Sequence, residues 1–489
     1  MSALGTEKKR LFGTSGVRGV VGQDLTMGLC HRVGKALGTS LPPRSHICLA
    51  TDTRQSRELV KGAVSSGLLS TGINVADLGI LPTPALALLT REMGFDTGIM
   101  LTASHNPPEY NGIKLFNKDA TGYNQAQEME LEKLYFARKF RQAKGTSQQT
   151  HDGKERYLSF IQDKLPASEI NHRLKLVVDP GNGAASGFAS YIFAQMGLNV
   201  IPLNDQPDGL FPGRNPEPKE DTLQGTVEFL RQRDADLAIC FDGDADRVVF
   251  CDKEGFLGFN EMISFIASLA VNKTGKKRIA TTVETGRLLD LTLEEFGGEV
   301  TRGKVGDVNV AYLARELDAA LGVEGVGVYI FPELGYYPDS IFATLNLLSQ
   351  LNDVAEIRQY FQSMPTLFFE KSKVPCPNRL KETVMAQLTD PSLPLSVTDK
   401  QPQINTIDGL RLEFADSWML IRPSGTEPAI RVIAESSTKS QADELIKEGM
   451  ELVQSLISSS PIKGEEIREG KLRKGDETNN ILAPLAGES

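Results

Sequence analysis

The amino-acid sequence predicts a multidomain α/β protein, and three observations carry this prediction. The chain has 489 residues, which is more than a single hydrophobic core supports. Short apolar runs alternate with stretches of helical spacing, a pattern typical of α/β units with mostly parallel, buried strands. Polar loops directly follow several of these runs, at the sheet edge where such folds bind their ligands.

The expected strands are short apolar runs bounded by Gly, Pro or Asp. They cover residues 46–52, 97–104, 174–183, 235–244 and 278–284. A helix is expected between the first two runs, because apolar side chains recur with helical spacing at Val60, Ala63, Val64, Leu68 and Leu69. The loops TASHNP, DPGNG and DGDADR lie at the carboxyl ends of expected strands, so we expect them to share one site.

Four domains are expected from breaks in these patterns. The Gly- and Gln-rich stretch 143–154 is typical of a linker, a helical pattern restarts within 255–261, and prolines interrupt 372–378. The expected domains are 1–154, 155–257 and 258–371, each α/β, and a smaller α+β C-terminal domain, 372–460. In this last domain a helix over 438–457 has one apolar face and is expected to pack on a small sheet. Residues 461–489 contain few large apolar side chains, so we expect a disordered tail.

Composition and charge exclude several classes of protein. The net charge of −10 argues against a nucleic-acid-binding surface, although it is compatible with a local basic pocket for a small anion. The five cysteines are scattered without a CxxC pair, so neither a disulfide framework nor a zinc site is expected. No apolar run approaches the roughly 20 residues of a membrane span. We therefore expect a cytoplasmic monomer or homodimer with no nucleic-acid or membrane partner.

Three aspartates in the loop DGDADR form a candidate metal site. Asp242, Asp244 and Asp246 are spaced by two residues, so an extended backbone would place all three carboxylates on one side. A cation would relieve their mutual repulsion, and oxygen ligands favour Mg²⁺ or Ca²⁺. An EF-hand is excluded, because Arg247 and Lys253 stand where its loop requires Gly and Glu. An Asp-rich surface turn is the alternative interpretation.

The loop RPSGTEP is a candidate phosphate site. The residues that would contact the phosphate are Arg422, Ser424, Gly425, Thr426 and Arg431. They offer backbone N–H groups, two hydroxyls and two permanently charged guanidinium groups, and a solvated hairpin turn is the alternative. No Walker-type loop and no GxGxxG loop after a strand occurs in the sequence, so the phosphate is expected on a small metabolite rather than on a nucleotide.

Ser104, in the loop TASHNP, is expected to carry a phosphoryl group. A hydrolase nucleophile is a weaker interpretation, because the sequence lacks GxSxG and an adjacent histidine rarely points its ring at the hydroxyl. A phosphoserine would supply an oxygen that completes the Mg²⁺ shell, so Ser104 joins the three aspartates as a metal ligand. Lys114 is expected to assist proton or charge transfer nearby.

Taken in order, these motifs resemble those of the α-D-phosphohexomutases, which include phosphoglucomutase/phosphomannomutase and phosphoglucosamine mutase. The motifs are FGTSGVRG, TASHNPPEYNGIKLFN, FPGRNPEP, DGDADR, KVGD and RPSGTEP, and they span about residues 10–437. The resemblance implies four domains around a central cleft. Three are similar α/β domains with mixed or parallel sheets, and the smaller C-terminal domain carries the phosphate-binding loop.

The resemblance also implies roles for single residues. Ser104 would be the phosphoserine, the three aspartates would bind Mg²⁺, and Lys114 would act as general acid or base. Arg18, His105 and Arg247 would surround the transferred phosphoryl group. The residues that would hold the other phosphate are Arg422, Ser424, Gly425 and Thr426.

The loop 322–333 departs from the GExSGH pattern of the family's third domain. Glu324 and Gly327 match, and Glu324 is expected to contact sugar hydroxyls, but Val326 and Val328 stand at the Ser and His positions. Valine forms no side-chain hydrogen bond, so we expect loose discrimination between glucose and mannose phosphates. A loop that is merely packed by its valines is the alternative at these two positions.

The expected function is that of a phosphohexomutase of the phosphoglucomutase/phosphomannomutase type. It would interconvert hexose 1-phosphate and hexose 6-phosphate, with Mg²⁺ and with a hexose bisphosphate as intermediate and activator. Phosphoglucosamine mutase is the alternative. A magnesium-dependent sugar phosphatase and a non-catalytic sugar-phosphate sensor are further alternatives, because a fold does not fix a function.

Overall fold

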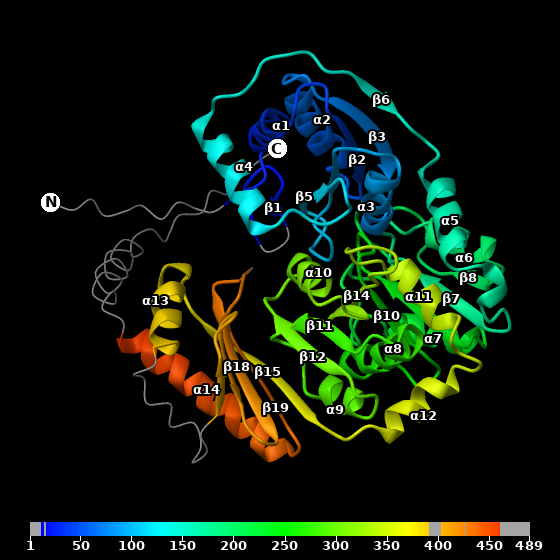
Figure 1. Ribbon diagram of the computed structural model, residues 1–489, viewed down its shortest axis with the longest axis vertical. Helices are drawn as coiled ribbons and strands as arrows, with labels where there is room; N and C mark the ends of the chain where they lie inside the picture. Colours follow the sequence, from blue (N-terminus) through cyan, green and yellow to red (C-terminus); the bar gives the residue numbers. More distant parts are fainter. Residues whose placement is uncertain (1–10, 14–15, 391–401, 426, 460–489) are drawn as a thin grey trace, which may run out of the picture. The chain divides into compact units, whose positions relative to one another are not determined.

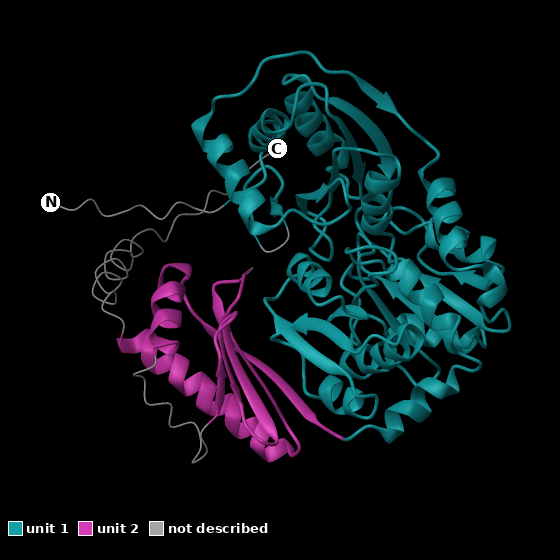
Figure 2. Ribbon diagram, in the orientation of Figure 1, with its two compact units in different colours: residues 1–365 teal, residues 366–489 magenta. Residues whose placement is uncertain are grey.

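The computed structural model describes residues 11–13, 16–390, 402–425 and 427–459. The chain divides into two compact units, residues 1–365 and residues 366–489 (Figure 2). Within the described residues, unit 1 contains three α/β sheets and unit 2 contains one antiparallel sheet (Figure 1). The tail expected over 461–489 lies outside the described residues.

The first sheet of unit 1 is mixed, with the strand order β1-β5-β4-β2-β3-β6. Its strands are β1 (Val17–Val20), β2 (His46–Thr51), β3 (Asn74–Ile80), β4 (Thr97–Leu101), β5 (Tyr110–Asn117) and β6 (Ser147–Gln149). Its helices are α1 (Met27–Ser40), α2 (Arg57–Leu69), α3 (Thr83–Glu92) and α4 (Gln125–Ala137). β2 is parallel to β4 and β3, so the loops that follow β2 and β4 leave the sheet at the same edge.

Strand β6 lies within the stretch 143–154, which was expected to be a linker. Ser147–Gln149 pairs in parallel with residues 75–77 of β3, and all three of its side chains are exposed. Backbone hydrogen bonds alone hold this edge strand, so its Ser and Gln residues show no apolar alternation. The linker prediction did not include this strand, because nothing in the side chains of these residues indicates one.

The second and third sheets have the orders β10-β9-β7-β8 and β12-β11-β13-β14. The strands are β7 (Lys175–Asp179), β8 (Asn199–Pro202), β9 (Leu237–Phe241), β10 (Val248–Cys251), β11 (Arg278–Thr282), β12 (Glu299–Gly303), β13 (Leu321–Glu324) and β14 (Val328–Ile330). The helices are α5 (Gly153–Lys164), the short 3-10 helix η1 (Ala167–Glu169), α6 (Ala189–Gln195), α7 (Gln224–Gln232), α8 (Phe259–Thr274), α9 (Leu288–Glu294), α10 (Asp307–Glu316), α11 (Ser340–Leu348) and α12 (Ala355–Ser363). In each sheet the strands are parallel except for one antiparallel hairpin strand, β10 or β14.

One apolar core runs through all three sheets of unit 1. It includes Met100 of β4, Val178 of β7 and Val323 of β13. Helix α11 lies inside it, and every residue of this helix is buried. Asp339 caps α11 by accepting a hydrogen bond from the Phe342 N–H. Because apolar packing is continuous, the loops at the sheet edges keep fixed positions relative to one another.

Unit 2 contains an antiparallel sheet with the order β15-β19-β18-β17-β16. Its strands are β15 (Phe368–Pro375), β16 (Gln403–Asn405), β17 (Leu410–Glu413), β18 (Ser417–Pro423) and β19 (Ala429–Ser436), and its helices are α13 (Asn378–Leu388) and α14 (Lys439–Ser459). Helix α14 packs on the sheet through buried residues such as Leu445 and Val453, which confirms the helix expected over 438–457. Pro375 ends β15 and Pro377 directly precedes α13, so both prolines lie inside unit 2.

Trp418 of β18 is the only tryptophan in the sequence, and it is fully buried in unit 2. The guanidinium carbon of Arg411 lies 3.8 Å from the centroid of its ring. Its indole Nε1 donates a hydrogen bond of 2.8 Å to Glu435 Oε2. The ring is therefore held between a cation and a carboxylate, which fixes its orientation in the core.

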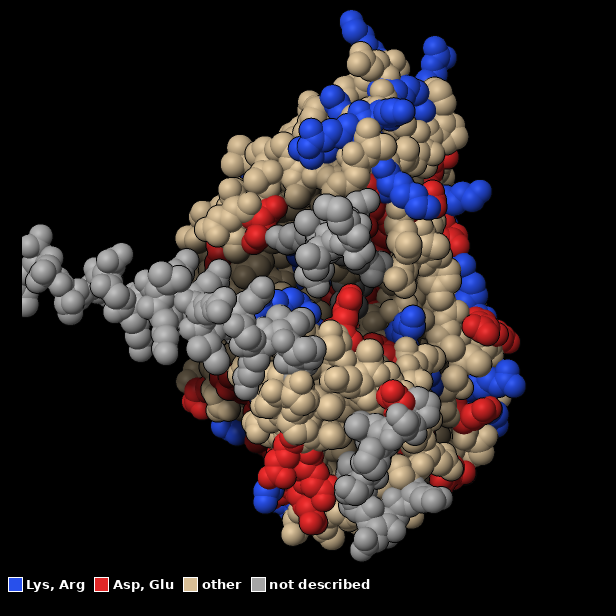
Figure 3. Space-filling model, turned by 90° about the vertical axis from the view of Figure 1, so that its left-hand side faces the viewer, with Lys and Arg blue, Asp and Glu red and all other residues tan. Residues whose placement is uncertain are grey.

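Among the described residues, no helix combines the length and the apolar character that crossing a bilayer requires. The surface charge is uneven on the face that Figure 3 shows. Lys and Arg side chains gather at its upper end, over the first sheet of unit 1, and both signs alternate lower down. The acidic net charge of the chain therefore conceals local basic surface.

Candidate active site

The candidate site begins where β4 and β9 end in unit 1. Ser104 lies in the loop after β4, and Asp242 is the first residue after β9. The Ser104 hydroxyl donates a hydrogen bond of 2.6 Å to Asp242 Oδ2 and lies 3.2 Å from His105 Nδ1. Ser104 and Asp242 are both 0% exposed. The structure thus brings together the residue expected to carry phosphate and a residue expected to bind metal.

The three aspartates of DGDADR converge in a turn. One oxygen from each of Asp242, Asp244 and Asp246 lies within 4.8 Å of the others. The Ala245 N–H donates to the Asp242 carbonyl at 3.2 Å, and Ala245 has a φ of 57°, in the left-handed region. The carboxylates gather as expected, but the extended backbone predicted from their spacing was wrong. The turn folds the chain back, and the Asp242 N–H reaches the carbonyl of Arg247 at 3.4 Å.

This cluster fits a hard cation. The Oδ1 atoms of Asp244 and Asp246 are buried, and neither has a hydrogen-bond partner among the described residues, which is costly for a carboxylate. Burial and the two neighbouring carboxylates raise the pKa of Asp242 well above its usual value. A divalent cation between the three groups would offset both costs, and an all-oxygen donor set suits Mg²⁺ or Ca²⁺.

Lys114 extends from β5 to the same carboxylates. Its Nζ donates to Asp244 Oδ2 at 2.7 Å and to Asp246 Oδ2 at 2.6 Å. Burial opposes the charge of Lys114, but the two carboxylates outweigh burial and raise its pKa. Lys114 is therefore an ammonium ion in the free protein, and it neutralises part of the cluster.

Thr83, the first residue of α3, was not identified from the sequence. Its hydroxyl donates to Asp244 Oδ2 at 2.6 Å, the oxygen that Lys114 also contacts. Burial would raise the pKa of Asp244, but Lys114 and Thr83 outweigh it and hold this pKa below its usual value. Because two donors occupy Oδ2, Oδ1 is the oxygen left for a cation. A threonine at a helix start carries no motif, so only the structure reveals this contact.

Arg18, His105 and Arg247 adjoin the Ser104 loop and the aspartates. Arg18 Nη1 donates to Asn106 Oδ1 at 3.4 Å, and Arg247 Nε lies 3.8 Å from Asp246 Oδ1. The Nε atoms of both arginines are buried and lack hydrogen-bond partners among the described residues, so they are available to an anion. Burial, Arg247 and Arg18 lower the pKa of His105 to about 2, so its ring is neutral.

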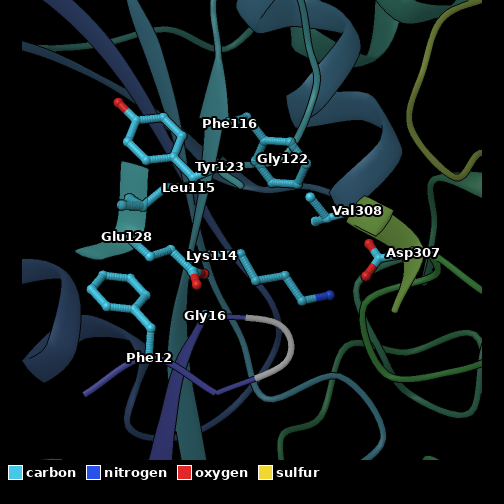
Figure 4. A pocket seen from close by; sticks show the side chains of 10 residues that line it. All are labelled: Phe12, Gly16, Lys114, Leu115, Phe116, Gly122, Tyr123, Glu128, Asp307 and Val308. Carbon is cyan, nitrogen blue, oxygen red and sulfur yellow. The ribbon is translucent and has the colours of Figure 1, made fainter. Parts of the chain in front are cut away.

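A cavity lies beside Lys114, between β5 and the start of α10 (Figure 4). Lys114 and Asp307 both point into it. Burial raises the pKa of Asp307, and Lys114 opposes this effect. The remaining lining residues are Phe12, Gly16, Leu115, Phe116, Gly122, Tyr123, Glu128 and Val308. Asp307 belongs to the motif KVGD, and the sequence alone predicted no role for any residue of this motif.

Glu324 lies at the end of β13 and is 7% exposed. Its Oε1 accepts a hydrogen bond of 2.8 Å from the Gly306 N–H. Burial and the negative charge of Asp307 outweigh the attraction of Arg247 and raise the pKa of Glu324 to about 7. The charged form is therefore disfavoured, and a cationic ligand group beside Glu324 would restore it.

Val326 lies in the turn between β13 and β14, and Val328 is the first residue of β14. Val328 is 2% exposed, and Val326 packs against the same apolar cluster. Gly327 has a φ of 85°, and a Cβ there would lie 2.4 Å from the Val248 carbonyl, so this close approach to β10 requires glycine. At these two positions the structure therefore supports the packing interpretation.

In unit 2, the residues expected to bind phosphate surround the turn between β18 and β19. Arg422 and Arg431 are directly opposite each other in the strand pair. Ser424 is 3% exposed, and its carbonyl accepts a hydrogen bond of 2.7 Å from Lys381 Nζ. Gly425 is exposed, and Thr426 lies outside the described residues. Phosphate binding by this loop stays a prediction.

Four family models match the chain in succession. They are the phosphoglucomutase/phosphomannomutase alpha/beta/alpha domains I, II and III, over residues 9–142, 155–255 and 260–367, and the C-terminal domain, over residues 373–452. Together they cover most of the sequence, and they agree with three α/β sheets followed by a smaller C-terminal domain with an antiparallel sheet.

Relatives and solved structures give the same result. The probable phosphoglucosamine mutase of Pyrococcus horikoshii is 39% identical over 453 residues, which is 92% of this chain and 98% of the relative. That of Pyrococcus abyssi is 37% identical over 456 residues, 92% of this chain and 99% of the relative. A phosphoglucomutase/phosphomannomutase family protein from Burkholderia thailandensis has a similar structure, with a TM-score of 0.79 and 26% identity over 92% of this chain and 98% of that chain.

Proposed function

Since the chain belongs to the phosphoglucomutase/phosphomannomutase family, the α-D-phosphohexomutases, we propose that it interconverts hexose 1-phosphates and 6-phosphates through a phosphorylated Ser104. Membership makes the chain an intramolecular phosphotransferase of the isomerase class. The observation that carries the proposal is the 2.6 Å hydrogen bond from Ser104 Oγ to Asp242 Oδ2. It sets the proposed phosphoryl carrier directly against the candidate cation site.

The residues around Ser104 suit a phosphoryl group on its hydroxyl. The guanidinium groups of Arg18 and Arg247 offset the negative charge, and the neutral His105 ring is within hydrogen-bond distance of Oγ. Mg²⁺ held by the three aspartates, with an oxygen of the phosphoserine as a further ligand, would act as a Lewis acid that offsets charge on the transferred group. Because Ser104 is fully buried, water has little access to the phosphoserine.

The reaction is proposed to proceed by two transfers. In the first, the phosphoryl group moves from Ser104 Oγ to a free hydroxyl of the hexose monophosphate, and a hexose bisphosphate results. In the second, the opposite phosphate of this bisphosphate moves to Ser104. Each transfer requires one proton to leave the attacking hydroxyl and one to reach the leaving oxygen. Lys114, an ammonium ion in the free protein, is proposed to donate a proton in one direction and to accept it in the other.

Unit 2 is proposed to bind a phosphate group of the sugar phosphate. Arg422 and Arg431 lie opposite each other on β18 and β19, so two permanently charged groups project from neighbouring strands. The Ser424 N–H donates to the Ala429 carbonyl at 2.9 Å, which holds the two ends of the turn together. Two guanidinium groups beside this turn suit a phosphate group, whichever sugar carries it.

Glucosamine phosphate is the proposed sugar substrate, in preference to the glucose and mannose phosphates expected first from the sequence. The names of the curated relatives support this choice. The site adds a physical reason, because an ammonium group on the sugar would offset the charge of Glu324, which burial and Asp307 disfavour. Val326 and Val328 offer no hydrogen bond that would distinguish one sugar hydroxyl from another.

The 1-phosphates of glucosamine, glucose and mannose are expected to differ in kcat/KM. We expect glucosamine 1-phosphate to exceed glucose 1-phosphate by about 10- to 100-fold, the effect of one hydrogen bond to a charged group. Glucose and mannose phosphates are expected to lie within roughly 100-fold of each other. Coupled assays with the three sugars measure this, and free phosphate measured in the same reactions separates a mutase from a phosphatase.

The variant Glu324→Gln is the control for this comparison, because it keeps the shape and removes the charge. It is expected to reduce the preference for the amino sugar to within about threefold, while kcat/KM for glucose 1-phosphate changes less. Equal kcat/KM values for all three sugars in the unmodified protein would contradict recognition of the ammonium group.

The preference for the amino sugar is expected to fall as the pH decreases from 7 to 5. Burial raises the pKa of Glu324 to about 7, so its carboxylate is about half charged at pH 7 and almost fully neutral at pH 5, whereas the sugar amine stays protonated over this range. The ratio of kcat/KM for glucosamine and glucose 1-phosphates measures this effect, because ionisation of the shared phosphate cancels in the ratio. A ratio that is constant over this range would assign the preference to another group.

A further inference from the structure

Arg54 is a buried arginine to which the proposed mechanism assigns no role, and all five of its N–H groups are engaged. Its Nε donates to Asp52 Oδ2 at 3.0 Å. Its terminal nitrogens donate to four backbone carbonyls of the loop that carries Ser104. These carbonyls belong to Ser104 (2.9 Å), Asn106 (2.6 Å), Pro107 and Tyr110 (3.0 Å). The side chain is fully buried, so a single guanidinium fills the interior of the loop.

The loop depends on such a group because its backbone turns inward. Ser104 has a φ of 52°, a conformation that residues other than glycine rarely adopt. The four backbone carbonyls that Arg54 contacts would be buried without hydrogen-bond partners if the guanidinium were absent. A lysine at position 54 would offer three donors from one nitrogen, whereas the planar guanidinium offers five in a fixed fork. The shape of the loop therefore requires arginine rather than a positive charge alone.

Asp52 links Arg54 to the backbone N–H of Ser104. Asp52 Oδ2 accepts a hydrogen bond of 2.7 Å from Thr102 Oγ1, and Thr102 Oγ1 accepts one of 2.8 Å from the Ser104 N–H. Ser104 is thus held through both its carbonyl and its N–H. Because both peptide groups are fixed, the direction of its Cα–Cβ bond is also fixed, and the hydrogen bond to Asp242 then sets the position of Oγ.

The same segment contacts the second sheet. The guanidinium carbon of Arg54 lies 5.2 Å from the centroid of the Phe211 ring. Thr53 Oγ1 donates to the Asn182 carbonyl at 2.9 Å. A Cβ at Gly209 would lie 2.5 Å from Arg54 Cα, so the backbones approach as closely as glycine permits. Arg54 therefore binds the backbone of the Ser104 loop and also contacts the loops of the second sheet.

The loop that carries Asp242 is held by a comparable pair. Arg214 Nε donates to Asp179 Oδ2 at 3.0 Å, and Arg214 Nη2 donates to the Phe241 carbonyl at 2.7 Å, one residue before Asp242. Both loops of the Ser104–Asp242 contact thus rest on a buried arginine that is paired with an aspartate. The two loops that form the contact between Ser104 and Asp242 are therefore each held in place by a buried arginine.

We propose that Arg54 is a positioning residue for phosphoryl transfer, which sets the place and direction of Ser104 Oγ relative to Asp242. This role rests on the proposed function, because it requires Ser104 to be the phosphoryl carrier. Arg54 contacts neither the substrate nor the cation in this role. It acts through the backbone of the loop.

Full-length Arg54→Lys is expected to lower kcat by about 100-fold or more, because a displacement of about 1 Å in a reacting group has an effect of this size. KM for the hexose 1-phosphate is expected to change less than about threefold, since ground-state binding is retained. The rate at which Ser104 takes up a phosphoryl group from hexose 1,6-bisphosphate, measured by rapid quench and peptide mass spectrometry, is expected to fall by the same factor as kcat.

Arg141→Lys is the matched control. Arg141 also donates to three backbone carbonyls around the first sheet, those of Gly38, Leu41 and Thr71, but it does not contact the Ser104 loop. Its replacement is expected to lower the melting temperature and to leave kcat unchanged. An equal loss of kcat in the two variants would overturn the positioning role, because it would then reflect general destabilisation.

The unmodified protein separates the possible failures. If its Ser104 takes up no phosphoryl group, the proposed function fails and this role fails with it. If its Ser104 is phosphorylated but folded Arg54→Lys has a kcat within about threefold of it, the positioning role alone is overturned. If Arg54→Lys does not fold, Thr102→Val replaces it, because this change removes the link between Asp52 and the Ser104 N–H. Thr102→Val is expected to lower kcat by about 10-fold at unchanged KM, and an unchanged kcat overturns the role.

Discussion

Replacing Ser104 with alanine is expected to abolish mutase turnover, with a loss of roughly 10⁴-fold or more, while the fold is retained. The hydroxyl is the proposed phosphoryl carrier, so without it the first transfer has no phosphoryl donor. Removing Oγ also removes the 2.6 Å hydrogen bond to Asp242, which costs about 1–3 kcal/mol of stability. Such a loss lowers the melting temperature by a few degrees and does not unfold a chain of this size. Steady-state assays and a thermal melt measure the two effects separately.

Ser264→Ala is the control for this change. Ser264 is buried in α8, and its Oγ has no hydrogen-bond partner among the described residues. Its replacement by alanine is therefore expected to leave both turnover and melting temperature nearly unchanged. If Ser104→Ala kept most of its activity, the phosphoryl group would have to be carried by another residue, and the proposed mechanism would be wrong.

Asp244→Asn is expected to weaken Mg²⁺ binding and to lower kcat together, the latter by about 10³-fold. The size follows from the several kcal/mol that a bound metal contributes to charge stabilisation during transfer. Asp244 Oδ2 already accepts hydrogen bonds from Lys114 and Thr83, and asparagine would lose the ionic part of this contact as well as one anionic ligand. Titration calorimetry with Mg²⁺ and the Mg²⁺ dependence of kcat measure the two losses.

Asp252→Asn is the matched control for the metal site. Asp252 follows β10 of the same sheet and pairs with Arg358 at 2.7 Å, away from the three clustered aspartates. Its replacement is expected to leave Mg²⁺ affinity unchanged. An Asp244→Asn protein with unaltered Mg²⁺ affinity would place the cation elsewhere in the chain.

Much of the fold could be predicted from the sequence, because buried parallel strands leave a clear pattern. The apolar runs 46–52, 174–183 and 235–244 each contain a strand, since side chains on both faces of such a strand must be apolar. The edge strand β6 could not be predicted, because it contributes backbone hydrogen bonds and exposes its side chains. The periodicity of apolar residues indicates which side chains are buried, so it cannot indicate a strand whose side chains are all exposed.

The candidate site was predicted where residues adjacent in sequence carry the chemistry. Asp242, Asp244 and Asp246 stand in one short motif, although the left-handed Ala245 that gathers them in a turn was not foreseen. Thr83 reaches Asp244 across 161 residues of sequence, and no local pattern reports such a contact. Arg54 escaped prediction for a similar reason, because its role depends on backbone carbonyls rather than on partner side chains.

The buried Trp418 gives the two units separate optical signals. All ten tyrosines of the chain lie in unit 1, and its single tryptophan lies in unit 2. Tryptophan emission therefore reports the environment of the sheet of unit 2, while tyrosine emission reports unit 1. When both emissions are followed in one denaturant titration, coincident transitions indicate that the units unfold together, and separate transitions indicate that they unfold independently. No dye or label is needed to distinguish these two cases.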